Sequence, residues 1–318
     1  MPHPADAHGE AAADAATVDP RVRVGSVELR NPVMTASGTA GYGTELAPYV
    51  DLAGLGAVVT KSIAAYEWAG NPAPRVHPTA QGMLNAVGLQ GPGIRHWLDE
   101  ELPDLLDTGA TVVCSIWGRS VDDYRAAAEA LAESPDEVVA VEVNLSCPNL
   151  EGRGAIFAHD AELSARVIEA TAGCGRPRWA KLSANTDRIV DVAGAVREAG
   201  AEAVTLINTL LGMVIDRDTW QPALGAGGGG LSGRAIHPVA VRAVYDVRAA
   251  HPDLPIVGVG GVASGWDAAE LMLAGADAVQ VGTASFADPS ACGLVLAELV
   301  ELAAARSMHR LADLGAVG

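Results

Sequence analysis

Residues 141–149 read VEVNLSCPN and mark the point at which a predicted buried strand ends in polar side chains. Two β-branched valines continue the apolar run of residues 138–140, which favours a strand, and Pro148 ends it because proline has no N–H for a sheet. Cys147 and two asparagines lie at the strand's carboxyl end, where parallel α/β proteins carry out chemistry. A cysteine after a strand is often an inert small hydrophobe, so the motif alone leaves the role of the thiol open.

A buried run followed by an amphipathic stretch occurs eight times along the chain. The runs are rich in valine and do not alternate cleanly, which is typical of parallel strands buried on both faces. Eight repeats fit a (β/α)8 TIM barrel better than an open doubly wound sheet, and no GxGxxG fingerprint follows the first run. The expected strands span residues 32–36, 57–61, 111–116, 138–144, 178–183, 203–208, 256–260 and 278–282. The expected helices span residues 44–52, 93–105, 120–132, 161–172, 186–199, 237–250, 266–274 and 290–305.

Segments outside these repeats have their own signatures. Residues 21–31 alternate around a Gly-Ser pair and predict a β-hairpin that caps the bottom of the barrel. Two long connections, 62–93 and 209–235, follow strands and therefore lie on the catalytic face, where long ordered loops usually act as lids or substrate walls. The expected organisation is a disordered N-terminal tail at 1–20, one barrel domain at 21–306 and a C-terminal tail at 307–318.

The composition argues against several classes of function. The 318 residues carry a net charge of −18, which disfavours binding to nucleic acid and to an anionic membrane surface. No apolar run is long enough to span a membrane, and the Ala/Asp/His-rich start does not match a signal peptide. The four cysteines are scattered with no CxxC pair, so we expect neither a metal site nor a disulfide framework, and the cytoplasm is the default location.

Lysine is rare in this chain. Among the 21 basic residues only Lys61 and Lys181 are lysines, and each ends a predicted strand. A compact ammonium differs in its chemistry from the planar guanidinium fork of arginine. We therefore interpret the two lysines as functional residues, with a plain compositional bias as the alternative explanation.

Glycines follow the last two predicted strands of the barrel. Gly260 and Gly261 end the seventh strand, and Gly282 and Thr283 end the eighth, where such barrels commonly bind a phosphate through bare backbone N–H groups. Gly233, in the long loop after the sixth strand, could add another close backbone approach. This pattern indicates a phosphorylated cofactor, and glycines needed only for tight turns are the alternative.

Ten short motifs lie in order along the chain: NPVMTASGT, TKS, NPAPRV, MLNAVGLQ, NLSCPN, AKLS, LINTLLGM, GGLSG, GVGGV and QVGTA. Together they resemble the class 1 dihydroorotate dehydrogenases, and especially the class 1B catalytic subunit, from about residue 22 to about residue 300. The cysteine in NLSCPN separates the chain from membrane-linked class 2 relatives, which carry serine there. LINTLLGM favours class 1B over class 1A, and SCPN differs from the SCPH of dihydropyrimidine dehydrogenases.

The resemblance implies an FMN-binding barrel that oxidises (S)-dihydroorotate to orotate in de novo pyrimidine (UMP) biosynthesis. Cys147 would remove a proton from C5 while a hydride passes from C6 to flavin N5. Because the thiolate is the competent base, proton removal should rise with pH. Lys61 would be the second catalytic residue, close to both flavin and substrate. The implied cofactor-binding residues are Ala36, Ser37, Gly38, Lys61, Ser62, Ser115, Asn144, Lys181, Ile207, Gly233, Gly260, Gly261, Gly282 and Thr283. The implied substrate-binding residues are Lys61, Asn85, Ala86, Val87, Gly88, Leu89, Asn144, Asn149, Asn208 and Thr209.

One residue departs from the family pattern. The family usually has asparagine where Ser115 stands in CSIWG. The shorter hydroxyl could leave a water between the third strand and the flavin. This departure concerns the contact with the cofactor and not the chemistry of the site.

The resemblance also implies partners. Class 1B chains pass electrons to NAD through a second subunit that carries FAD and a 2Fe–2S cluster, and the dispersed cysteines of this chain do not match cluster ligands. We therefore expect a homodimer, or a heterotetramer with that subunit. Three alternatives stay open: a fumarate-linked class 1A-like dehydrogenase, a dihydropyrimidine dehydrogenase-like reductase, and a catalytically silent barrel that serves as a binding module.

Overall fold

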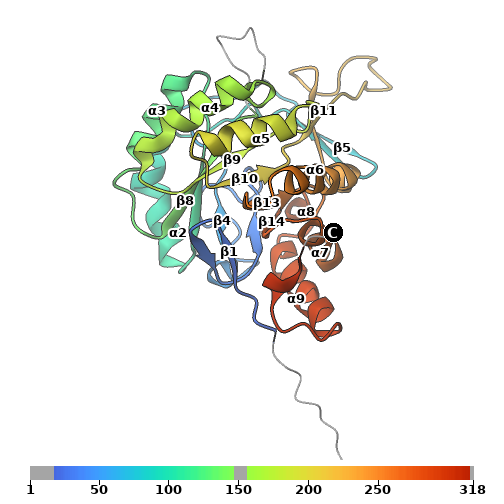
Figure 1. Cartoon of the computed structure of the whole chain (residues 1–318). Helices are drawn as coiled ribbons and strands as arrows, with labels where there is room; N and C mark the ends of the chain where they lie inside the picture. The colour runs from blue at the N-terminus through green and yellow to red at the C-terminus, as the bar shows by residue number, and fades with distance from the viewer. Residues whose placement is uncertain (1–17, 147–155, 316–318) are drawn as a thin grey trace, which may run out of the picture.

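A computed structural model describes residues 18–146 and 156–315, and its centre is a sheet of eight parallel strands surrounded by helices (Figure 1). The strand order is β3-β14-β13-β10-β9-β8-β7-β4. A parallel bridge from Met34 to Ala57 and a 2.8 Å bond from Gly56 N to Val33 O join the two edges, so the sheet closes on itself. The predicted (β/α)8 TIM barrel is confirmed. Its strands are β3 (Val33–Thr35), β4 (Val58–Val59), β7 (Val112–Ile116), β8 (Val138–Asn144), β9 (Arg178–Lys181), β10 (Ala203–Leu206), β13 (Ile256–Val259) and β14 (Ala278–Val281).

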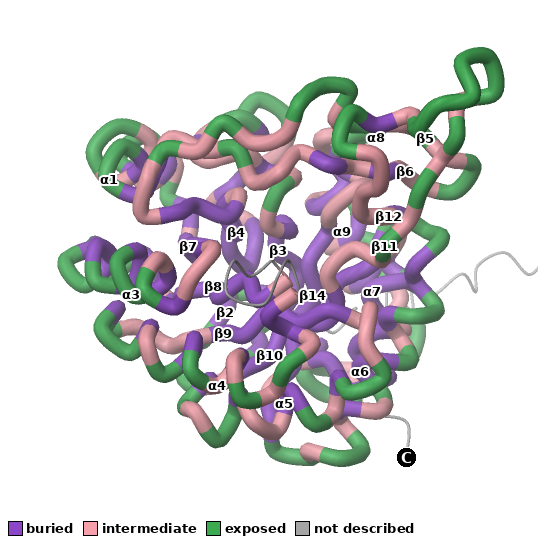
Figure 2. The backbone as a smooth tube through the Cα atoms, turned by 90° about the horizontal axis from the view of Figure 1, so that it is seen from above, coloured by how far each residue is buried: buried purple, intermediate pink, exposed green. Residues whose placement is uncertain are grey.

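Helices form the outer ring, and Figure 2 shows the buried strands at the centre with exposed backbone around them. Apolar side chains from strands and helices form one continuous core, because parallel strands are covered on both faces. The helices are α1 (Ile94–His96), α2 (Leu102–Asp107), α3 (Val121–Ala130), α4 (Ala161–Ala170), α5 (Ile189–Glu198), α6 (His237–Ala250), α7 (Gly265–Leu273), α8 (Ala284–Ala287) and α9 (Ala291–Ala304). Shorter helical turns are η1 (Leu52–Gly54), η2 (Trp97–Glu101), η3 (Phe157–His159), η4 (Thr171–Cys174), η5 (Arg234–Ile236) and η6 (Leu311–Asp313).

One predicted helix is wrong. Residues 44–52 form successive turns, such as Ala47 N to Thr44 O at 2.9 Å, and only η1 follows them. Pro48 lies in the middle of this segment, where it has no N–H for a helical bond and its ring would clash with the preceding turn. The first helix of the eightfold repeat is therefore replaced by turns, while the other predicted helical stretches carry helix.

The two long connections fold together into a second, antiparallel sheet over the barrel mouth. Its strand order is β11-β12-β6-β5. Connection 62–93 supplies β5 (Val76–Thr79) and β6 (Gly82–Asn85), and connection 209–235 supplies β11 (Leu210–Gly212) and β12 (Gly229–Ser232). We call these four strands the mouth sheet. The connections therefore pair with each other, which makes them a wall of ordered backbone at the mouth.

The opposite end of the barrel is covered by the predicted hairpin, β1 (Val22–Val24) and β2 (Val27–Leu29). Its four alternate apolar residues are buried, and Ser26 N donates to Glu202 Oε2 at 3.0 Å, just before β10 begins. Residues expected in the two tails meet beside it. Val18 is buried, and Asp19 pairs with His309 and Leu311 through backbone bonds of 2.8 and 2.9 Å. Residues 1–17 lie outside the described part of the chain.

Candidate functional site

A cavity of about 430 Å³ lies between the carboxyl ends of the barrel strands and the mouth sheet. Because every barrel strand points the same way, loops that are far apart in sequence converge on this one hollow. All the described site residues predicted from the sequence line it, with the exception of Ser115. They are Ala36, Ser37, Gly38, Lys61, Ser62, Asn85, Ala86, Val87, Gly88, Leu89, Asn144, Lys181, Ile207, Asn208, Thr209, Gly233, Gly260, Gly261, Gly282 and Thr283.

Bare glycine backbone lines one end of the cavity, beyond β13 and β14. Gly233, Gly260 and Gly261 have φ of 92°, 138° and 72°, a region that favours glycine. A Cβ on Gly261 would come within 2.7 Å of the Cβ of His237 and 2.9 Å of Gly233 O, so side chains are excluded for lack of space as well. The ring of His237 fixes this turn, because its Nδ1 lies 2.8 Å from the carbonyl of Gly260. We call these three glycines, with Gly282, the glycine cradle. It fits the phosphate of a nucleotide-like cofactor, which binds backbone N–H groups.

Lys181 ends β9 under the cavity and is 3 % exposed. Its Nζ donates to Ser37 Oγ at 2.9 Å and to Gln280 Oε1 at 3.4 Å, and lies 3.5 Å from Glu142 Oε1. Three separate barrel strands therefore hold one ammonium group in place. A positive charge fixed beneath the cavity suits a ring system that gains electrons.

Lys61, at the end of β4, occupies a different environment and is partly exposed. Its Nζ donates to Gln90 O at 2.5 Å and lies 4.8 Å from the centre of the Tyr42 ring. Burial, with Arg75 as a second cause, lowers the pKa of Lys61 from the ordinary lysine value. Arg75 itself is tied to the loop by bonds to Asn71 O at 2.6 Å and Ala69 O at 3.0 Å. The two lysines therefore enter the cavity from different sides with different partners.

The three described asparagines that the sequence predicted as substrate ligands all line the cavity. Asn144 is the last residue of β8 and Asn208 follows β10, and Nδ2 of Asn208 donates to Oδ1 of Asn144 at 3.2 Å. Asn85 faces them from the mouth sheet, where its Nδ2 donates to Gly230 O at 3.3 Å. Amides offer donors and acceptors without a net charge, so this arrangement suits a flat heterocycle with amide-like edges.

The segment from Asn85 to Leu89 is held from behind by its neighbours. Trp68 Nε1 donates to Gly88 O at 3.0 Å, and Asn71 Nδ2 donates to Ala86 O at 3.1 Å. These bonds turn a loop of small residues into a defined wall of the cavity. The same loop carries Gln90, the partner of Lys61.

Ser115 does not line the cavity, although the sequence places it at the cofactor. It is fully buried one layer below, where its Oγ lies 2.9 Å from Ser62 Oγ and 3.4 Å from Glu142 Oε1. Ser62, and not Ser115, is the hydroxyl that reaches the cavity. Cys147 and Asn149, the predicted base and a predicted substrate ligand, lie outside the described residues.

Sequence reasoning missed several residues of the site. Asn185 lines the cavity and receives Leu211 N at 2.8 Å, which anchors the start of β11. Glu142 lies below the cavity, where it is fully buried between Lys181 and Ser115. A signal for Glu142 was available, because a carboxylate in the middle of a buried barrel strand needs dedicated partners.

The three described cysteines lie away from this cavity and are buried. Burial raises the pKa of Cys114 and Cys174 and raises the pKa of Cys292 to about 11. A thiol with a raised pKa is a poor source of thiolate at neutral pH. None of these three cysteines is therefore a candidate for the base.

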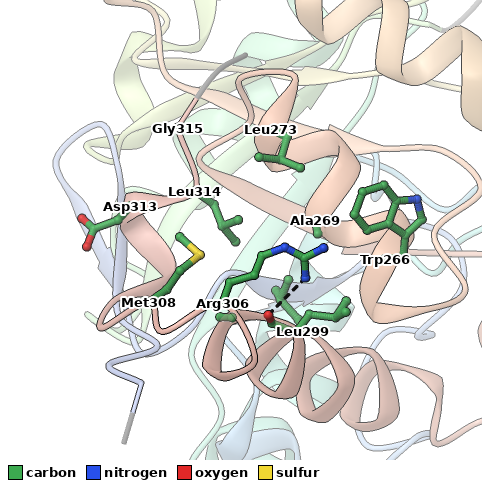
Figure 3. Close-up of a pocket in the computed structure, with 11 residues that line it drawn as sticks. Trp266, Ala269, Leu273, Leu299, Arg306, Met308, Asp313, Leu314 and Gly315 are labelled. Atoms are coloured by element: carbon green, nitrogen blue, oxygen red, sulfur yellow. Dashed lines mark hydrogen bonds between the residues drawn. The ribbon is translucent and has the colours of Figure 1, made fainter. Parts of the chain in front are cut away.

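A second, smaller hollow of about 220 Å³ lies on the outside of the barrel, between α7, α9 and the C-terminal segment (Figure 3). Figure 3 shows Trp266, Met308 and Leu314 around it, with Arg306 donating to Leu302 O at 3.4 Å. It contains none of the predicted site residues. Among the described residues, no helix is long and apolar enough to cross a membrane.

Comparisons with known proteins agree with the cavity's chemistry. The family model described as dihydroorotate dehydrogenase matches residues 21–302. The chain is 45% identical over 282 residues to the protein named dihydroorotate dehydrogenase B (NAD(+)), catalytic subunit, of Geobacter sulfurreducens, covering 88% of this chain and 92% of that protein. Proteins of the same name from Geotalea uraniireducens and Listeria monocytogenes are 47% and 44% identical, over 86% and 92% of this chain and 89% and 96% of those proteins. The chain therefore belongs to the dihydroorotate dehydrogenase family, as its class 1B-like motifs indicated.

Proposed function

We propose that this chain oxidises (S)-dihydroorotate to orotate with FMN bound across the barrel mouth, as a step of pyrimidine biosynthesis. The observation that carries the proposal is the convergence of the glycine cradle, Lys181 and three amides on one cavity of about 430 Å³. Each of these features comes from a different strand end. A barrel used only as a binding module would not need a buried ammonium held by three partners beneath its cavity.

The described residues fit FMN. The glycine cradle would hold the phosphate through its backbone N–H groups, since the positive φ and close packing of Gly260 and Gly261 leave no room for a side chain. Lys181 would lie against the ring system, with Ser37 and Gly38 of the β3 end beside it. When bound, FMN would supply the redox chemistry by accepting a hydride.

The substrate's pyrimidine ring would lie against Asn85, Asn144 and Asn208, whose amides match its imide and amide edges. Lys61 would face the carboxylate of the substrate, because an ammonium is the natural partner of an anion there. Cys147 remains the predicted base for the C5 proton. Its place in the sequence, three residues after Asn144, supports a position at the same strand end.

The relatives' shared name includes the words catalytic subunit, which implies a partner subunit. We propose that electrons leave through an iron–sulfur flavoprotein that carries FAD and a 2Fe–2S cluster and delivers them to NAD. A homodimer, or a heterotetramer with that partner, and a cytoplasmic location belong to the same proposal.

The first test is an anaerobic reduction of the purified protein. We expect a yellow protein with about one FMN per chain, whose visible absorption bleaches when dihydroorotate is added and does not bleach with dihydrouracil. Finding FAD, or no flavin after reconstitution, would contradict the cofactor. A flavin that dihydrouracil bleaches and dihydroorotate does not would contradict the substrate.

The electron acceptor is tested separately. Purified chain alone should turn over with an artificial dye and should neither reduce NAD nor use fumarate efficiently. Adding the iron–sulfur flavoprotein encoded by the same organism should restore NAD reduction. Turnover with fumarate in the absence of any partner would favour the class 1A-like alternative instead.

A further inference from the structure

A carboxylate lies inside the barrel, directly below the cavity. Glu142 belongs to β8, two residues before Asn144, and none of its surface is exposed. Gln280 Nε2 donates to its Oε2 at 2.7 Å, while Lys181 Nζ and Ser115 Oγ lie 3.5 and 3.4 Å from its Oε1. A buried ion pair contributes little to stability compared with apolar packing of the same volume. The pair of Glu142 and Lys181 therefore needs another reason to be there.

The carboxylate fixes the direction of a chain of hydrogen bonds. An ionised carboxylate has no hydrogen to donate, so the Ser115 hydroxyl donates to Glu142 and must accept from elsewhere. Ser62 Oγ, 2.9 Å away, is its donor. Having given its only hydrogen to Ser115, Ser62 Oγ accepts from Asn144 Nδ2 at 3.1 Å. The charge on Glu142 thus favours the orientation in which Nδ2 of Asn144 points down into the barrel.

Backbone groups at the far end of the chain agree with this direction. A backbone N–H is always a donor, and Ser146 N lies 3.1 Å from Asn144 Oδ1. The same oxygen accepts from Asn208 Nδ2 at 3.2 Å, and Asn208 Oδ1 accepts from Thr209 N at 2.7 Å. The orientation of two amides in the candidate substrate site is therefore consistent from the barrel interior to the cavity wall.

The second set of bonds from Glu142 leads to the candidate cofactor site. Gln280 bridges the ion pair, because its Nε2 donates to Glu142 while its Oε1 accepts from Lys181 at 3.4 Å. Lys181 then reaches Ser37 on the cavity wall at 2.9 Å. One carboxylate thus contacts the ammonium beneath the cavity and also ends the chain that orients the amides.

We propose that Glu142 is a positioning residue which balances the charge of Lys181 beneath the flavin and orients the Asn144 and Asn208 amides toward the substrate. This rests on the proposed function. With Glu142 in place, the buried pair of Glu142 and Lys181 has no net charge. The positive charge of Lys181 that acts on the flavin site is therefore partly cancelled. Without Glu142, Lys181 is an uncompensated cation, and the Ser115 and Ser62 hydroxyls lose the acceptor that sets their direction, so that only backbone N–H groups still orient the amides.

The test replaces Glu142 by glutamine, which keeps the shape and removes the charge. We expect Glu142→Gln to bind FMN one to one but to favour the reduced flavin about tenfold more, because reduction adds negative charge beside Lys181. For a two-electron couple that is a midpoint potential about 30 mV more positive. Orotate affinity, measured by perturbation of the flavin spectrum, should fall about tenfold, since a glutamine can donate to Ser115, which turns the Ser62 hydroxyl toward Asn144 Nδ2 and sets two donors against each other.

Ser115→Ala separates the two effects. It breaks the chain to the amides and leaves Glu142, Gln280 and Lys181 in place, so orotate affinity should fall while the midpoint potential stays at the wild-type value. Glu198→Gln, an exposed residue at the end of α5, is the matched control and should change neither quantity.

Wild-type midpoint potential and orotate affinity in a fully loaded Glu142→Gln protein would overturn the proposal. If Glu142→Gln does not fold, Ser115→Ala tests the proposal instead. Unchanged orotate affinity in that variant would contradict the chain of hydrogen bonds from Glu142 to Asn144. A wild-type protein whose flavin is not reduced by dihydroorotate contradicts the proposed function instead, since the midpoint and the orotate titration need no turnover.

Discussion

Single side chains decide the chemistry of this barrel, and the sequence identified many of them by type. The two lysines were singled out because arginine fills every other basic position, and both line the cavity. The contacts that distinguish them were not predictable, since Gln280, Ser37 and Gln90 come from distant segments. Glu142 could have been singled out as a carboxylate within a buried strand, but its partners Lys181, Gln280 and Ser115 come from other strands and were not predictable.

Lys61 should not tolerate arginine. Its Nζ fits between Gln90 O at 2.5 Å and the Tyr42 ring at 4.8 Å, with the guanidinium of Arg75 already bonded in the same loop. A second planar guanidinium needs more room and adds donors that find no acceptor. We expect Lys61→Arg to bind FMN normally and to reduce it with dihydroorotate at least tenfold more slowly, measured by anaerobic stopped flow. Arg197→Lys, on the exposed end of α5, is the control, and wild-type kinetics for Lys61→Arg would show that the two lysines reflect composition only.

Cys147 can be tested although it lies outside the described residues. If it is the base, Cys147→Ala should slow flavin reduction by roughly 10²–10⁴-fold. FMN content and orotate affinity should stay at the wild-type level, because the glycine cradle binds FMN and the asparagines bind orotate. Cys147→Ser should recover more activity at high pH than Cys147→Ala if its hydroxyl can substitute as a base. If Cys147→Ala reduces the flavin at the wild-type rate, Cys147 is not the base. The three buried cysteines could not take over that role.

Among the elements, periodicity and composition predicted the barrel strands to within a few residues, but not the mouth sheet. Strand β12 reads GGLS, which has little strand propensity, and it pairs with β6 across the whole middle of the chain. Long-range pairing of this kind leaves no local signature. The helix expected at 44–52 failed for a local reason, because Pro48 outweighs the apolar spacing around it.

The turn after β13 gives the sharpest test of the cradle. In Gly261→Ala the new Cβ would meet His237 Cβ at 2.7 Å and Gly233 O at 2.9 Å, in a backbone with φ of 72°. We expect FMN affinity to fall at least tenfold and riboflavin affinity to fall much less, because riboflavin has no phosphate. Fluorescence titrations with both flavins measure this ratio. Gly293→Ala in α9, where a Cβ meets only Val50 at 3.5 Å, should bind both normally. An equal loss for both flavins would place the phosphate elsewhere.

For the molecule as a whole, the fold class followed from the eightfold repeat, while the two ends of the barrel required the structure. The hairpin was predicted at one end, and its contact with Glu202 supports its place before β10.

At the other end the mouth sheet and the barrel form the cavity together, so cofactor binding should stabilise both. At a free FMN concentration of 100 times Kd, ligand binding raises the free energy of unfolding by about 2.7 kcal/mol. For a domain of this size we expect Tm to rise by about 5 °C, measured by calorimetry, with a smaller rise for Gly261→Ala at the same FMN concentration. No rise in wild type would contradict FMN binding.

The pairing of β12 with β6 also sets an order of events during synthesis on the ribosome. Gly230 bonds to Asn85, 145 residues earlier, and the glycine cradle is completed only by Gly282. A nascent chain that has passed β6 must therefore grow by 145 residues, almost half of the protein, before the edge of β6 finds its partner β12, and contacts of such separation form late. Until then β6 is an open strand edge, the kind of surface that pairs with other chains. The proposed FMN site is complete only after nearly the whole barrel has left the ribosome. FMN therefore binds at the end of maturation.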